Sequence, residues 1–179
     1  MNYKSLISNK NINLIGPLIV SPTIHKDGRG YFFESWNKNS FNQIIGEEVD
    51  FVQDNQSKSS IGVLRGLHYQ VPPMAQGKLV RVTKGCIYDV IVDLRKDSPT
   101  FAQWGGLKLS EEFNNQLWVP IGFAHGFLTL SPYAIVEYKV TNFWSSNEEK
   151  SLIWNDKDIN IEWPKKNFNN QIPIISKKD

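Results

Sequence analysis

The sequence predicts an all-β fold with one short helix, and a jelly roll is the natural candidate. Many short apolar segments follow one another at close spacing, separated by turns rich in glycine, proline and asparagine. In several of these segments apolar and polar residues alternate, as in strands with one buried face. No repeat or long linker divides the 179 residues, so we expect a single domain over residues 1–179.

The most regular strand signals lie in the middle of the chain. Residues 78–83 and 86–94 flank a turn at Lys84-Gly85, so we expect them to pair as a hairpin. Alternation in the second of these segments places four side chains on one face: Ile87, Asp89, Ile91 and Asp93. Further strands are expected over residues 116–120, 123–130 and 134–141.

The helix and the C-terminal segment depart from this strand pattern. Ser40 can cap a helix over residues 41–45, and Gly46 can end it. Residues 164–179 are rich in lysine, asparagine and proline, and this composition alone predicts a mobile tail.

Composition argues against several functional classes. A net charge of +2 gives no basis for nucleic-acid binding by bulk charge, and a single cysteine excludes an internal disulfide. No stretch approaches the ~20 apolar residues that cross a membrane. Polar residues interrupt the N-terminal segment, unlike a signal peptide. We therefore expect a cytoplasmic protein with no nucleic-acid or membrane partner.

Chemically active side chains are concentrated between Phe51 and Arg95. His68, Lys78 and Arg65 stand on short apolar strands, where burying an unpaired charge is costly. Regular alternation puts Arg65 on the face opposite His68, unless a bulge at Gly66 brings both to one side. Taken singly, a half-buried histidine and a solvated lysine without a catalytic role are the commoner cases.

Two later strands add His125 and Tyr138. His125 shares a face with two phenylalanines, and Tyr138 shares one with valines, where core packing is the commoner role. Together with His68 and Lys78 they supply a base, an acid and a cation on adjacent strands. This set suits the removal and return of a proton beside a ketone, on an anionic sugar or acyl substrate.

A metal site fits the sequence poorly. Barrels of this type often bind iron or zinc through a His-x-His pair, a glutamate and a distant histidine. Here Tyr69 and Gln70 follow His68, so the close pair is missing. No nucleophile elbow and no GxGxxG motif occurs. We expect no metal and no cofactor.

The chain resembles the dTDP-4-dehydrorhamnose 3,5-epimerase family over nearly its whole length. The motifs that carry the resemblance are DGRGYFFES, FVQDNQSKS, GVLRGLHYQ, AQGKLVR, VDLRKDSPTFAQW, LWVPIGFAHGF, EYKVTN and WNDKDINIEWP. The resemblance implies a cupin-type jelly roll (a double-stranded β-helix barrel) with minor short helices. It also implies metal-free epimerisation of carbons 3 and 5 of dTDP-4-keto-6-deoxyglucose, giving dTDP-4-keto-L-rhamnose for dTDP-rhamnose biosynthesis.

The same resemblance implies roles for individual residues. His68 would be the general base, Tyr138 the general acid on the opposite sugar face, and Lys78 would stabilise the enolate. An aspartate pairs with the base histidine in this family, and Asp179 is the candidate here. The terminal α-carboxylate and Asp89 stay open as alternative partners. The implied substrate-binding residues are Arg29, Glu34, Gln53, Asn55, Arg65, His125, Trp144, Glu149 and Lys178.

Family resemblance further implies a homodimer. The N-terminal segment, residues 1–50, would contribute to the dimer and to the partner's site, so Arg29 and Glu34 would act in trans. Residues 164–179 would form a C-terminal tail that carries Asp179. Trp144 is the candidate to stack on thymine, and Phe143 stands where the family often has tyrosine.

Three alternative functions stay open at this point. A relative of the same fold could epimerise one carbon only, because His68, Lys78 and Tyr138 fit epimerisation without fixing the number of carbons. A 3,4-ketoisomerase of nucleotide sugars is the second alternative, and a non-enzymatic or metal-binding cupin is the third.

Overall fold

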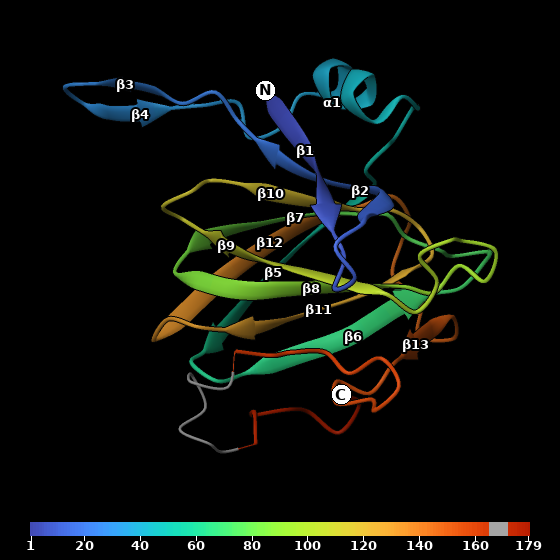
Figure 1. Cartoon of the computed structure of the whole chain (residues 1–179). Coiled ribbons are helices and arrows are strands. Elements are labelled where there is room, and N and C mark those ends of the chain that lie inside the picture. The colour runs from blue at the N-terminus through green and yellow to red at the C-terminus, as the bar shows by residue number, and fades with distance from the viewer. Residues whose placement is uncertain (165–171) are drawn as a thin grey trace.

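The computed structural model describes residues 1–164 and 172–179, which form two facing antiparallel sheets (Figure 1). In spatial order the six-stranded sheet contains β1 (Asn2–Ile7), β2 (Asn13–Ser21), β10 (Gln116–Val119), β7 (Lys78–Lys84), β12 (Tyr133–Val140) and β5 (Gln53–Ser60). The five-stranded sheet contains β13 (Glu149–Ser151), β6 (Leu64–Gln70), β11 (Phe123–Thr129), β8 (Cys86–Asp93) and β9 (Trp104–Ser110). The predicted all-β fold is confirmed, and two facing sheets are the arrangement of a jelly roll.

The strands β10, β11 and β12 match the segments expected from the sequence, but one expected pairing is wrong. Strands β7 and β8 do not form a hairpin, because β7 pairs with β10 and β12 whereas β8 pairs with β9 and β11. Gly85 between them has φ +79°, and a Cβ there would lie 2.2 Å from the carbonyl oxygen of Tyr133. This crowded, left-handed turn carries the chain from one sheet to the other.

Strand β8 is buried on both faces, which explains its nearly unbroken apolar character. Ile87 and Ile91 pack in the core between the two sheets. Val90 and Val92 pack on the other side of the five-stranded sheet with Trp163, in the segment that passes outside this sheet. The core between the sheets therefore receives the face of β8 that also carries Asp89 and Asp93.

Helix α1 (Lys38–Ile45) lies against the outer face of the six-stranded sheet (Figure 1). Its N-cap is Asn37, whose side chain accepts a hydrogen bond from the Ser40 backbone N–H, so the expected Ser40 cap is wrong. Gly46 ends the helix in the left-handed conformation, as predicted. Among the described residues, no helix is long and apolar enough to cross a membrane.

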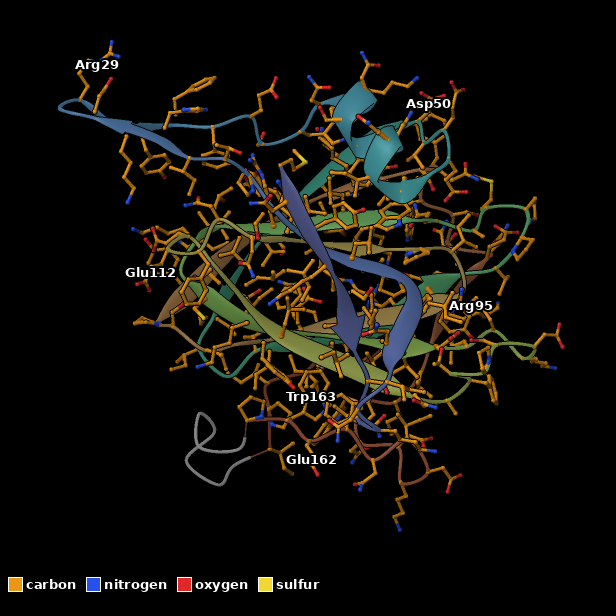
Figure 2. All side chains as sticks on the ribbon, turned by 45° about the horizontal axis from the view of Figure 1, so that its top comes forward. Arg29, Asp50, Arg95, Glu112, Glu162 and Trp163 are labelled. Atoms are coloured by element: carbon orange, nitrogen blue, oxygen red, sulfur yellow. The ribbon has the colours of Figure 1, made fainter. Side chains whose placement is uncertain are left out.

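Two segments reach beyond the sheets at opposite ends of the chain. Strands β3 (His25–Asp27) and β4 (Gly30–Phe32) form a hairpin arm that extends away from the barrel, with Arg29 near its tip (Figures 1 and 2). The residues 172–179 lie along β6, where Leu64 N–H donates to the carbonyl of Ile174 at 2.9 Å. The mobile tail expected from composition is therefore wrong for these residues, and residues 165–171 lie outside the described part.

Candidate active site

Most of the expected site residues line one open region between the two sheets. Two adjoining cavities of about 250 and 240 Å³ share His68, Lys78, Tyr138, Trp144 and Glu149. Around this shared set, the first cavity adds Gln53 and Asn55, and the second adds Arg65, His125, Lys178 and Asp179. Both sheets therefore contribute side chains to one pocket.

A bulge in β6 places Arg65 and His68 in the same pocket. His68 pairs with His125 and Arg65 pairs with Phe127, so β6 has one more residue than β11 along this stretch. Gly66 has φ +113°, and a Cβ there would lie 2.6 Å from the Cα of Gly126. Glycine is thus required where the two strands approach, and the bulge brings both side chains to one side.

His68 lies beside the carboxylate of Asp179. Its Nε2 atom is 2.8 Å from Oδ1, and the Asp179 side chain is only 4% exposed. Although burial alone raises it, hydrogen bonds from the Ser176 side chain and backbone and from Gly66 N–H hold the pKa of Asp179 below its usual value. The structure thus places Asp179, and not Asp89, next to His68.

The surroundings of His68 favour its neutral imidazole. Burial lowers its pKa, the charge of Lys178 lowers it further, and Asp179 opposes both. A neutral imidazole near pH 7 can accept a proton, whereas an imidazolium cannot. The lowered pKa of His68 therefore favours the form that a general base needs.

Asp89 forms a second carboxylate–histidine pair in the core. Its Oδ1 atom lies 2.9 Å from Nε2 of His125, and the Asp89 side chain is fully buried. Among the described residues, Oδ2 of Asp89 has no hydrogen-bond partner. Sequence analysis did not pair these two residues, although alternation puts both on the inner faces of their strands.

Lys78 and Tyr138 approach from the six-stranded sheet, on β7 and β12. Burial lowers the pKa of Lys78 to about 8, although Glu149 and Asp89 raise it, and its Nζ donates to the carbonyl of His68 at 3.2 Å. Burial raises the pKa of the Tyr138 hydroxyl, and Glu149 adds to the effect. The raised pKa favours the protonated form of Tyr138, which lines the same cavities as His68 from the other sheet.

The rim of the pocket is polar and partly charged. Lys178 forms an ion pair with Glu149 at 3.1 Å, and Arg65 donates from Nε to the Ser59 hydroxyl at 2.9 Å. The Trp144 indole, 57% exposed, stands at the same opening. Cationic groups and an exposed aromatic ring at one opening can bind a phosphate and a flat ring.

Arg29 and Glu34 do not reach this pocket within the same chain. Arg29 lies on the extended arm and pairs with Asp27 at 2.6 Å (Figure 2). Glu34 accepts a hydrogen bond from the Asn37 side chain at 3.2 Å.

Some pocket residues were missed by the sequence analysis. Gln70, Gln76, Ser57 and Ser176 also line the cavities. Gln70 could have been found, because in regular alternation it shares the face of His68. No three histidine, cysteine, aspartate or glutamate side chains gather as possible metal ligands within residues 1–164 and 172–179.

Sequence comparison gives one consistent family. The family model for dTDP-4-dehydrorhamnose 3,5-epimerase matches residues 11–179. A relative with that description from Salmonella typhimurium is 56% identical over 162 residues, which cover 90% of this chain and 86% of the relative.

Solved structures agree with this assignment. A dTDP-6-deoxy-D-glucose-3,5-epimerase from Legionella pneumophila, in complex with dTDP-4-keto-L-rhamnose, superposes with a TM-score of 0.89 at 40% identity, covering 99% of this chain and 90% of that one. A 3′-monoepimerase from Streptomyces bikiniensis, in complex with dTDP-quinovose, gives 0.83 at 33% identity, covering 92% and 81%. With its jelly roll and His68–Tyr138 pocket, this chain belongs to the dTDP-4-dehydrorhamnose 3,5-epimerase family.

Proposed function

We propose that this chain epimerises carbons 3 and 5 of dTDP-4-keto-6-deoxyglucose, giving dTDP-4-keto-L-rhamnose. One observation carries the proposal: His68 and Tyr138, which come from different sheets, line one pocket that also holds a buried Lys78. A base and an acid on opposite walls can remove a proton from one face of a sugar carbon and return one to the other. Inversion at that carbon is the result.

Proton removal is assigned to His68. The ketone at carbon 4 acidifies the hydrogens of carbons 3 and 5, and the ring nitrogen that does not face Asp179 takes one of them. The bonding electrons move onto the ketone oxygen and form an enolate. Lys78 stabilises this negative charge as an ammonium group whose side chain is buried and fixed in place, and a preorganised cation of this kind is effective.

Proton return is assigned to Tyr138. Its hydroxyl gives a proton to the opposite face of the same carbon, the enolate electrons re-form the ketone, and solvent then restores both side chains. The second carbon follows the same route after the sugar shifts in the pocket. Asp179 orients His68 throughout and stabilises the imidazolium that forms.

Substrate binding follows from charge and shape at the rim. Arg65 and Lys178 are placed to bind the diphosphate, and Trp144 to stack on thymine. The sugar would contact the polar residues of the inner pocket: Gln53, Asn55, His125 and Glu149.

A homodimer is part of the proposal. The arm that carries Arg29 extends beyond its own barrel, and Tyr31 and Phe32 on it are 61% and 68% exposed. Large exposed aromatic side chains on a projecting hairpin suit burial against a second copy. In that arrangement Arg29 and Glu34 would act in the partner's pocket. The expected cytoplasmic location stays a prediction.

Deuterium incorporation from heavy water, followed by NMR at carbons 3 and 5, tests the proposed reaction. Label at both carbons is the expected result. Label at carbon 3 alone would favour the single-carbon alternative, to which the Streptomyces bikiniensis relative lends weight. No label would contradict the proposal, and stoichiometric iron or zinc in the purified protein would contradict its metal-free chemistry.

A further inference from the structure

The backbone on either side of Trp144 is held by a buried glutamine. Gln70, the last residue of β6, is 7% exposed. Its Nε2 donates to the carbonyls of Met74 and of Phe143, the second at 3.1 Å, and its Oε1 accepts from the Ser145 N–H at 2.8 Å. Both N–H groups of the amide are thus used. Phe143 and Ser145, two of the three partners, directly precede and follow Trp144 in the chain.

Two further glutamines hold the same loop. The Trp144 N–H itself donates to Oε1 of Gln53 at 3.1 Å, and Nε2 of Gln76 donates to the carbonyl of Asn142 at 2.7 Å. The Asn142 side chain in turn donates to the carbonyl of Pro73 at 3.2 Å. Side-chain amides therefore order this loop where no strand ladder does, and Gln70 alone joins three separate backbone groups.

The indole that this loop presents has no packing partner of its own kind. Trp144 is 57% exposed, and among the described residues no aromatic ring packs on it. An exposed tryptophan on an ordered loop differs from one on a mobile loop, because the ordering entropy is lost before a ligand arrives. The arrangement favours a fixed stacking surface at the pocket rim.

We propose that Gln70 is a positioning residue for nucleotide binding, acting through Trp144. Its amide holds the carbonyl before Trp144 and the N–H after it, so that the indole is fixed in place to receive the base of the nucleotide sugar. This inference rests on the proposed function and assigns to Gln70 an effect on base affinity that runs through the backbone around Trp144.

The affinity for dTDP, measured by calorimetry, tests the role of Gln70. Replacing Gln70→Leu keeps most of the buried volume and removes every hydrogen bond of the amide. We expect dTDP to bind roughly 5- to 150-fold more weakly, the range for loss of one base-stacking contact, and Trp144→Ala to have a similar effect. For the substrate, KM should rise while kcat changes less than KM does.

A double-mutant cycle separates positioning from general damage. If Gln70 acts through Trp144, the double variant should bind dTDP within about 2-fold of Trp144→Ala alone, because the losses are not additive. Gln103→Leu is the matched control: Gln103 is also 7% exposed and bonds Ser8 at 2.8 Å away from the pocket. It should destabilise the fold but leave dTDP affinity within about 2-fold.

The other outcomes distinguish failure of the role of Gln70 from failure of the proposed function. Additive losses, or unchanged dTDP affinity in Gln70→Leu, would overturn the role of Gln70 while leaving the proposed reaction intact. Wild-type protein without dTDP affinity would overturn both. If Gln70→Leu fails to fold, Gln70→Glu replaces it, since the carboxylate keeps the length but turns an oxygen toward two carbonyls, and the same loss is expected.

Discussion

Asp89 and Asp93 share one face of β8, and both carboxylates are fully buried, yet their surroundings differ. Asp93 accepts hydrogen bonds from the Arg95 guanidinium, the Ser98 hydroxyl and the Thr100 hydroxyl at 2.6–2.9 Å. Asp89 contacts His125 through one oxygen, and its other oxygen has no partner in the described part of the chain.

We expect this difference to separate a carboxylate that stabilises the fold, Asp93, from one that serves the site, Asp89. Burial raises the pKa of Asp93, but the hydrogen bonds from Arg95, Ser98 and Thr100 outweigh it and hold that pKa at about 2. Arg95 lies at the periphery of the molecule (Figure 2). An incompletely bonded buried carboxylate costs stability, so Asp89 fits a role in holding His125 at the pocket.

Removing the proposed base, His68, should have the largest effect. It tests whether the pocket that Asp89 adjoins is catalytic. We expect His68→Asn to lower kcat by roughly 10²–10⁴-fold, the range for loss of a general base. Deuterium exchange at carbons 3 and 5 should disappear together. Exchange retained at either carbon would mean that another group removes that proton.

The substitution Asp93→Asn tests whether Asp93 stabilises the fold without contributing to activity. A folded-state pKa of about 2 against a usual 3.8 corresponds to about 2.5 kcal/mol at neutral pH. We expect urea unfolding to show a loss of that order, with activity per folded molecule unchanged. A strong loss of kcat in the folded variant would contradict the separation of the two roles.

The wild-type protein offers a pH test of the same carboxylate. Because folding lowers the pKa of Asp93, its contribution is complete above the unfolded value and is lost as pH falls from about 4 toward 2. The stability difference between wild type and Asp93→Asn, measured by urea unfolding, should therefore shrink over this interval. A constant difference would contradict the assignment.

The strands were easier to predict than their partners. Short apolar runs mark β10, β11 and β12 in the sequence. Only β12 alternates between buried and less buried positions, whereas β10 and β11 are buried along their whole length. The turn at Gly85 was equally visible, but nothing in it shows that β7 and β8 enter different sheets. Asn37 and Ser40 are both good caps, and only the backbone geometry selects Asn37.

In the site, too, local motifs could be predicted from the sequence, whereas contacts between distant segments could not. His68 and Lys78 could be predicted because each lies within a short continuous motif, RGLH for the histidine and QGKL for the lysine. The pairing of Asp89 with His125 depends on the register between β8 and β11, which joins strands far apart in sequence. Hydrogen bonds from Gln70 to a distant loop are invisible in the sequence for the same reason.

Asp89→Asn tests whether Asp89 contributes to activity rather than to stability, and it is a milder change than the loss of His68. Asparagine keeps a hydrogen bond to His125 but removes the charge, so the imidazole loses its orienting carboxylate. We expect kcat/KM to fall by roughly 10- to 100-fold. Stability should change by less than about 1 kcal/mol, because the carboxylate is incompletely bonded. A large stability loss with normal kcat/KM would make Asp89 a structural residue like Asp93.

The smallest expected effect concerns the electrostatics around His68. Lys178 lowers the pKa of His68 by its charge, so Lys178→Met should raise that pKa and move the acid limb of the kcat/KM profile to higher pH. The position of the limb is separable from any loss of overall kcat/KM through weaker substrate binding. The neighbouring Lys177, which is exposed, supplies the control Lys177→Met, and its limb should stay in place. If both variants shift equally, bulk charge rather than the placement of Lys178 sets the pKa of the base.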